Sequence, residues 1–388
     1  MSGSDSLSLY IHIPWCRVRC GYCDFNTYVV PTIPGTGLLQ AEKLDSRPGP
    51  MESYLDAVVE EVRLAAWALG TRWVTTVYFG GGTPTLMPAA DYRRVLDRVR
   101  DCFDLTPDAE ITTEANPETL TPELLDGIRA TGVNRLSMGM QSAVPHVLAT
   151  LDRAHTPGRV VEAVDWARAA GFSNLSLDLI YGTPGESVAD WETSVDSALA
   201  LEPEHISAYS LIVEDGTPLA RRMARGELPY PDEDDLADKY CLADEMFSSA
   251  GLGWYEVSNW ARPGSECRHN MAYWRSDDWW GIGAGAHSFV DGRRWWNYRR
   301  PETYAAAVEE GSPVEGSETL TPAQARTEAV MLGIRLSEGL DAGLLTGTEL
   351  ARAEEYVASG HLTRQGPRLV CTLKGRLIAD GITREILD

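Results

Sequence analysis

Long apolar runs, positive charge and cysteine are all scarce in this 388-residue sequence. It has no stretch of about 18 consecutive apolar residues, which excludes a membrane-spanning helix. The first ten residues, MSGSDSLSLY, lack the basic start and apolar stretch of a secretory signal. We therefore expect a cytoplasmic protein with at most peripheral membrane association. Acidic residues outnumber basic ones by 57 to 34, and the net charge of −23 argues against general nucleic-acid binding.

The seven cysteines are too few for a disulfide scaffold, but three of them stand close together. These are Cys16, Cys20 and Cys23, in the stretch IPWCRVRCGYCDF. In a reducing compartment such a group indicates metal or redox ligands. One alternative is tetrahedral zinc with a fourth ligand such as His12 or Asp24. The other is a [4Fe–4S] cluster with one iron left open, and buried cysteines without any ligand are less favoured.

Short β-type runs alternate with amphipathic helical segments over the first 211 residues. The β-type runs are 7–13, 74–80, 109–115, 134–140, 174–180 and 204–211, and the helical segments lie near 51–69, 88–102, 121–131, 157–170 and 188–200. This alternation predicts a parallel sheet with right-handed crossovers, and six units predict a complete or partial α/β barrel. The active site of such a barrel lies at the carboxyl ends of its strands, where we expect every candidate motif to lie.

Composition divides the chain into three predicted parts. These are a barrel over 1–225, an aromatic-rich extension over 226–312 and a small C-terminal module over 313–388. Within the barrel, the Pro- and Gly-rich stretch 29–50 predicts a long loop. The C-terminal module contains two short β-type runs around a turn, followed by a helix, which favours a winged-helix-like fold.

The cysteine loop resembles the signature of the radical S-adenosylmethionine (SAM) superfamily. The resemblance implies that Cys16, Cys20 and Cys23 hold a [4Fe–4S] cluster. It also implies that the fourth iron binds the amino and carboxylate groups of SAM. The run YFGGGTPT (78–85) resembles the Gly-rich turn of the same superfamily, which meets the methionine end of SAM. We expect its glycines to let the main chain approach that ligand closely.

Further motifs resemble one branch of the superfamily, oxygen-independent coproporphyrinogen III oxidase and its relatives, over most of the chain. The resemblance implies a radical SAM partial (β/α)6-type barrel. It also implies contacts with SAM for Tyr10, Tyr22, Gly81, Gly82, Thr83, Glu114, Gln141, Arg153 and Asp178. Taken singly, a carboxylate at a strand end is often a helix cap, and Arg153 could simply pair with Asp152. Their shared place at strand ends favours a cofactor pocket.

Phe25 marks a departure from that oxidase, which carries a further cysteine at this position. A phenylalanine side chain can neither ligate a metal nor relay a proton. In this respect the sequence resembles an oxidase-like subgroup, the heme chaperones of the HemW family. The stretch RHNMAYW (268–274) resembles the heme-binding motif of the subgroup, which implies that His269 ligates heme. His287 is a second candidate ligand.

These features predict a heme chaperone that binds heme and delivers it to apoproteins such as respiratory cytochromes. A radical SAM enzyme that acts on a porphyrinogen is the first alternative, although Phe25 counts against coproporphyrinogen oxidase activity. A zinc-binding interaction protein that uses the C-terminal module is the second. The sequence leaves open the identity of the heme acceptor, the cleavage of SAM and the oligomeric state, a homodimer included.

Overall fold

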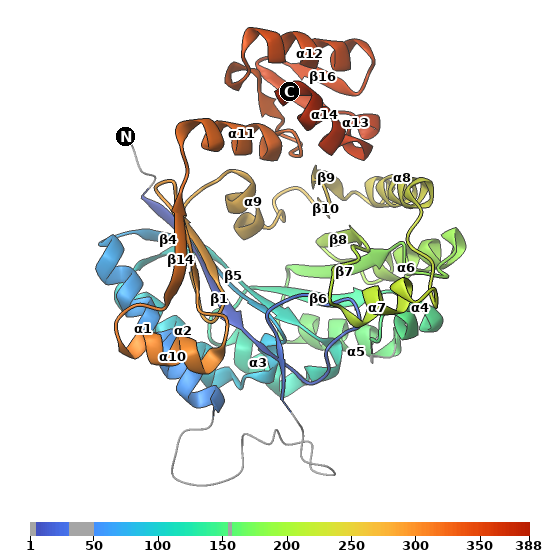
Figure 1. Ribbon diagram of the computed structural model, residues 1–388. Coiled ribbons are helices and arrows are strands. Elements are labelled where there is room, and N and C mark those ends of the chain that lie inside the picture. Colours follow the sequence, from blue (N-terminus) through green and yellow to red (C-terminus); the bar gives the residue numbers. More distant parts are fainter. Residues whose placement is uncertain (1–4, 31–49, 154–156) are drawn as a thin grey trace.

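A computed structural model describes residues 5–30, 50–153 and 157–388, so most of the predicted loop 29–50 lies outside it. Its centre is a curved sheet of twelve strands (Figure 1). Six of these strands are parallel neighbours: β1 (Ser6–Ile13), β4 (Trp73–Gly81), β5 (Asp104–Ala115), β6 (Arg135–Gln141), β7 (Leu175–Tyr181) and β8 (His205–Ser210). They coincide with the six predicted β-type runs. The predicted parallel sheet is therefore confirmed.

The predicted helices join these strands and lie along the outer, lower face of the sheet in Figure 1. They are α1 (Pro50–Leu69), α2 (Ala89–Cys102), α3 (Pro122–Arg129), α5 (Pro157–Ala169) and α6 (Val188–Leu199). The short helix α4 (Pro145–Thr150) lies in a stretch for which no helix was predicted. In α2 the buried side chains Tyr92, Val95, Leu96 and Val99 recur every three or four residues. That spacing gives a helix one apolar face, which here packs on the sheet.

Strands from the aromatic-rich stretch 226–312 extend this sheet at both edges. At the β8 edge they are β10 (Asn259–Ala261) and β9 (Gly253–Glu256), and at the β1 edge β11 (Trp279–Ile282), β12 (His287–Val290) and β13 (Arg293–Asn297), followed by β14 (Val314–Thr319). The helices of this part are α8 (Glu233–Ser249), α9 (Arg268–Trp274) and α10 (Pro301–Glu309), and α7 (Pro218–Ala224) precedes it at the end of the predicted barrel. Added strands give the exposed edges of the parallel sheet hydrogen-bonding partners.

The C-terminal module stands apart from the sheet, beyond α8 and α9 in Figure 1. It contains α11 (Pro322–Gly333), β15 (Leu340–Asp341), α12 (Gly347–Ala358), β16 (Leu362–Gln365), β17 (Arg368–Cys371), α13 (Leu373–Leu377) and α14 (Ala379–Leu387). The antiparallel pair β16–β17 with a helix after it matches the predicted pattern. The module has its own apolar core, which includes Val330, Leu362, Leu369 and Ile382.

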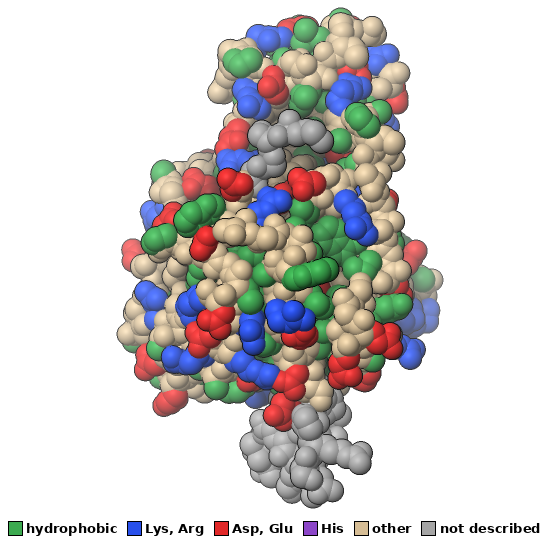
Figure 2. Space-filling model, turned by 90° about the vertical axis from the view of Figure 1, so that its left-hand side faces the viewer, with side chains coloured by type: hydrophobic (Ala, Val, Ile, Leu, Met, Phe, Trp, Pro, Cys, Tyr) green, Lys and Arg blue, Asp and Glu red, His purple; other side chains and the backbone are tan. Residues whose placement is uncertain are grey.

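No described helix combines the length and the apolar character that a membrane crossing needs. The surface carries charges of both signs (Figure 2). On the face seen in Figure 2, basic side chains are interspersed with acidic ones, and hydrophobic side chains gather near its middle. The net charge of −23 is therefore not a uniform acidic field on this face.

Candidate functional site

A single cavity of about 850 Å³ contains every residue predicted to bind the cluster or SAM, and one of the two candidate heme ligands, His269. Its lining includes Tyr10, Cys16, Cys20, Tyr22, Cys23, Gly81, Gly82, Thr83, Glu114, Gln141, Arg153, Asp178 and His269. The structure thus brings together residues that are up to 259 positions apart, Tyr10 and His269 being the outermost. His287 lies elsewhere, exposed on β12, where its ring stacks on Trp296 at 5.9 Å between centroids.

The cysteine loop follows β1 and presents its sulfurs to groups that suit thiolates. The hydroxyl of Thr83 donates to Cys16 Sγ at 3.6 Å, and Nη1 of Arg153 donates to Cys20 Sγ at 3.4 Å. Burial raises the pKa of the thiols of Cys16 and Cys23, and the hydrogen bond from Thr83 partly opposes this at Cys16. A metal that binds these sulfurs must displace their protons.

The groups beside the cysteine sulfurs, a hydroxyl and a guanidinium, fit a [4Fe–4S] cluster held by thiolates. Among the described residues, no three His, Cys, Asp or Glu side chains converge as a mononuclear metal site requires. In a [4Fe–4S] cluster each thiolate binds a different iron, so the sulfurs need not meet at one point. Three cysteines in one cavity, with a hydroxyl and a guanidinium against two of them, therefore suit a cluster. A bound cluster would supply one-electron chemistry to SAM at its open iron.

The Gly-rich turn at the end of β4 packs against the cysteine loop. The amide of Gly82 donates to Ile13 O at 2.8 Å, and the amide of Thr83 donates to Trp15 O at 2.8 Å. A Cβ on Gly82 would stand 2.5 Å from Trp15 O, and one on Gly81 (φ +110°) 2.4 Å from the ring of His12. Glycine is therefore required at these two positions by close packing within the protein, since a side chain would clash there. Close approach of their main chain to a ligand stays a prediction.

Two partly buried carboxyl groups, Glu114 and Asp178, line the cavity. Glu114 accepts from the Gly81 amide at 2.9 Å and from the Tyr78 hydroxyl at 3.0 Å, while burial raises its pKa to about 7. Asp178 accepts from the Ser137 hydroxyl at 3.2 Å, and burial raises its pKa as well. A cationic ligand beside these groups would favour their ionised forms. The ammonium and sulfonium groups of SAM have that charge.

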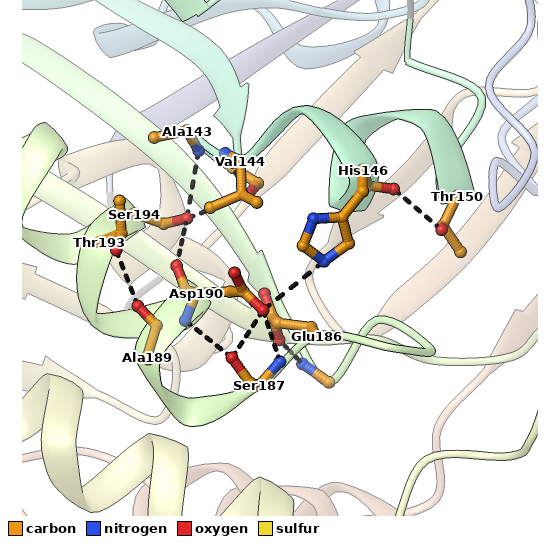
Figure 3. Close-up of polar contacts among 12 residues, drawn as sticks. Ala143, Val144, His146, Thr150, Glu186, Ser187, Ala189, Asp190, Thr193 and Ser194 are labelled. Atoms are coloured by element: carbon orange, nitrogen blue, oxygen red, sulfur yellow. Dashed lines mark hydrogen bonds and ion pairs between the residues drawn. The ribbon is translucent and has the colours of Figure 1, made fainter.

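Gln141 ends β6 in the left-handed backbone region, with φ of +63°. Such conformations persist where the surroundings hold them, and functional sites are enriched in them. The chain that follows is tied to α6, since the Ala143 amide donates to Ser194 Oγ at 3.1 Å (Figure 3). Nearby, His146 Nε2 lies 3.5 Å from a carboxylate oxygen of Asp190. These contacts fix α4, the helix that leads to Arg153.

His269 lies on α9, and its position corrects one prediction. It is 2% exposed, and Nδ1 lies 2.7 Å from the Thr76 hydroxyl. Its Nε2 lies 2.8 Å from the Tyr273 hydroxyl, and burial, with the charge of Arg135, lowers its pKa to about 3. The His269 amide donates to Glu110, four residues before Glu114 on β5. The expectation that every motif lies at carboxyl strand ends is therefore wrong for His269, because a helix brings it to the opposite end.

Sequence reasoning missed several residues of the cavity. Arg135, His205, Tyr209, Ile212 and Asn259 line it as well. A signal for two of them was present, since Arg135 and His205 each open a strand whose following residues are buried. A cationic or titratable side chain at the start of a buried strand has to be accommodated by polar surroundings.

Known proteins with the same pattern identify the family. The Radical SAM superfamily model matches residues 10–198, and the HemN C-terminal domain model matches residues 320–378. A heme chaperone HemW from Mycobacterium tuberculosis (strain ATCC 25618 / H37Rv) is 49% identical over 380 residues, which cover 98% of this chain and 94% of the relative. The chain belongs to the heme chaperone HemW family.

Another member of the HemW family is similar over nearly the full length. This relative, from Escherichia coli (strain K12), is 33% identical over 389 residues, 97% of both chains. A solved structure, coproporphyrinogen III oxidase (HemN) from Escherichia coli, described as a radical SAM enzyme, has a TM-score of 0.80 and 24% identity. The match covers 99% of this chain and 90% of that one. The predicted radical SAM α/β fold with a small C-terminal domain is thereby confirmed.

Proposed function

We propose that this member of the HemW family is a heme chaperone: it carries a SAM-coordinated [4Fe–4S] cluster, binds heme and delivers it to an apoprotein such as a respiratory cytochrome. The relatives at 49% and 33% identity are named heme chaperones. The observation that carries the proposal is the common cavity of three cysteines, partly buried carboxyls and His269. Cysteine ligands, a Gly-rich turn and an imidazole would otherwise have no reason to converge.

The roles of individual residues follow from their places in the cavity. Cys16, Cys20 and Cys23 would ligate the cluster. The residues assigned to SAM are Tyr10, Tyr22, Gly81, Gly82, Thr83, Glu114, Gln141, Arg153 and Asp178. His269 would ligate heme iron as a neutral imidazole. Because both of its ring nitrogens have partners, iron must displace the hydroxyl of Tyr273 or that of Thr76.

The rim of the cavity favours a carrier over an oxidase. Phe25, at the position of the additional oxidase cysteine, is 60% exposed, and the exposed side chains of Val18 and Ile212 also line the rim. A flat, largely apolar macrocycle is a suitable ligand for such side chains. None of the three can transfer a proton or bind iron. A radical SAM enzyme that acts on a porphyrinogen remains the alternative outcome of the test.

The test compares two activities on one anaerobically reconstituted preparation. We expect transfer of bound heme to an apocytochrome, measured by the spectrum of the acceptor, and no decarboxylation of coproporphyrinogen III. The substitution His269→Ala should shift the absorption spectrum of bound heme and weaken its retention, with partial binding left through apolar contacts. His287→Ala, outside the cavity, is the matched control. Robust decarboxylation by the wild type, or absence of heme binding, would contradict the proposal.

A further inference from the structure

Arg135 is a buried cation on the wall of the cavity, at the amino end of β6. It is the first residue of β6, whereas Gln141 at the other end of the strand is one of the residues assigned to SAM. The side chain of Arg135 is 2% exposed and lines the cavity. Its Nε is buried and has no hydrogen-bond partner among the described residues.

The other fully buried cation of the described chain shows how a structural charge is accommodated. Lys239 Nζ lies 3.2 Å from a carboxylate oxygen of Glu186 and 2.7 Å from one of Asp235. Among the described residues, no carboxylate oxygen lies within 4 Å of a guanidinium nitrogen of Arg135, so it forms no ion pair there. Because an unpaired buried charge is costly, its retention indicates a partner that the protein itself does not provide.

The carboxyls nearest to Arg135 already have other donors. Glu110 accepts from the amides of Arg268 and His269, each at 3.1 Å, and from the Cys267 thiol at 3.7 Å. Asp178 accepts from serine hydroxyls, including that of Ser137. Both carboxyls influence Arg135 through their charge without forming an ion pair with it. The guanidinium thus remains available to an anion in the cavity.

We propose that Arg135 binds a carboxylate of the tetrapyrrole that the cavity receives, namely a propionate group of heme. This inference rests on the proposed function. A guanidinium matches a carboxylate through two parallel N–H···O bonds, which a neutral side chain cannot provide. The rim offers apolar contacts through Phe25 and Ile212, and the deep part of the cavity offers Arg135 beside His269. A ligand with a flat apolar body, a central metal and an acidic edge matches this distribution.

The methionine carboxylate of SAM is the other source of the same chemistry. SAM is expected at the cysteine end, where Arg153 donates to Cys20 Sγ. Arg135 lies at the opposite end of β6 from Gln141, but its charge acts on Asp178, which is also assigned to SAM. The experiment therefore measures the responses to heme and to SAM separately.

The test uses the full-length reconstituted protein with two probes, hemin and hemin dimethyl ester, whose propionates are blocked. Binding is followed by titration of the Soret band. We expect the wild type to bind hemin at least about tenfold more tightly than the ester, since a charge-assisted bidentate contact contributes at least that factor. Arg135→Gln should weaken hemin binding by about tenfold or more and remove the preference. Arg135→Lys should retain part of it.

Arg129→Gln, on α3 and outside the cavity, is the control and should leave both affinities unchanged. The cluster absorbance and the effect of SAM on the paramagnetic resonance spectrum of the reduced cluster should be the same in Arg135→Gln as in the wild type. Equal affinities of the wild type for hemin and its ester would overturn the inference while leaving heme binding intact. Loss of the SAM response in Arg135→Gln with unchanged hemin binding would overturn it too. If the wild type binds neither probe, the proposed function itself fails.

Discussion

Glu61 on α1 is a buried carboxyl that ties the barrel to the strands added at the β1 edge. It accepts from the Gly283 amide at 2.8 Å, the Tyr304 hydroxyl at 2.6 Å and the Asn297 side-chain amide at 2.8 Å. Burial raises its pKa to about 7 despite these three donors. The desolvation of the charged form thus outweighs the hydrogen bonds that favour it.

Glu61 should make the protein less stable as the pH rises. Its folded-state pKa lies above the unfolded value, so its contribution is fully present below about pH 4.5 and is lost as the pH rises through about 7. The loss above both pKa values is on the order of 3 kcal/mol. We expect Glu61→Gln to reduce the decrease in unfolding free energy between pH 5 and 8, measured by denaturant titration of the cluster-free protein. Burial also raises the pKa of Glu114 and of Glu256 to about 7. These two groups should therefore leave part of the pH dependence of the unfolding free energy in the variant.

The control is Glu60→Gln, one position earlier on the same helix. The side chain of Glu60 is 42% exposed, and its hydrogen bond with Arg63 lowers its pKa. That variant should retain the slope of the wild type. An unchanged slope in Glu61→Gln would show that Glu61 titrates normally in the folded protein.

The same two glutamates show what the sequence could and could not predict at this scale. The spacing of Cys16, Cys20 and Cys23 is local, so the cysteine loop could be recognised from a few letters. In VVEEVR, by contrast, helical spacing places Glu61 on the same face as Val58, but the letters do not say which groups it meets there. Only the fold shows that Glu61 meets Tyr304, 243 residues later. Arg135 escaped notice for the same reason, because its lack of a partner is a property of the three-dimensional neighbourhood.

At the scale of elements, α13 attaches the C-terminal module to α8 of the aromatic-rich extension through Arg376. Its Nη1 and Nη2 each donate to a carboxylate oxygen of Asp244 on α8, both at 2.7 Å. The guanidinium also lies over the rings of Trp254 and Tyr240, 4.5 Å and 5.5 Å from their centroids. The ion pair is largely buried, since the two side chains are 9% and 14% exposed. A bidentate, stacked contact of this kind holds two parts in one orientation.

Arg376→Ala should loosen the module without disturbing the cavity. It leaves Asp244 with the Trp260 indole as a remaining donor, and removal of one partner from a buried pair typically costs about 3 kcal/mol. We expect a lower melting temperature and faster proteolysis between 313 and 388, with unchanged cluster absorbance. Arg364→Ala removes an ion pair with Glu354 inside the module and is the control, with little effect expected. Equal proteolysis of the two variants would contradict a role for Arg376 in attachment.

Periodicity explains why most elements were predictable while their assembly was not. The runs that became β1, β4, β5, β6, β7 and β8 are short, apolar and separated by amphipathic helices, so their type and order followed from the sequence. The pairing of β11 with β1 joins Trp279 to Ser8, and no local pattern indicates such a contact. The same distance effect hid the place of α9, which brings His269 to the end of the barrel opposite to the one expected.

At the scale of the whole molecule, protein side chains alone form a continuous apolar core, to which the cluster need contribute nothing. The main core cluster runs from β1 through β8 to the helices outside the sheet and includes Trp15, next to Cys16. The cysteine loop is held to this body mainly by backbone contacts, among them Gly21 N to Leu151 O at 3.1 Å and Leu219 N to Gly21 O at 2.9 Å. In small zinc domains the metal supplies the folding energy, whereas here an extensive core should do so.

Removal of the cluster should therefore loosen the cysteine loop and leave the fold intact. We expect cluster-free protein to keep its far-ultraviolet circular dichroism and cooperative unfolding, with a melting temperature a few degrees lower because a ligand of the native state is lost. Trypsin should then cut at the exposed Arg17 and Arg19, which the cluster-loaded loop protects, and mass spectrometry identifies the cut. Cys16→Ser should behave like the cluster-free protein, and Cys102→Ser, outside the cavity, like the loaded one. Loss of cooperative unfolding on cluster removal would mean that the cluster organises the barrel itself, and equal cutting in both states would mean that it does not order the loop.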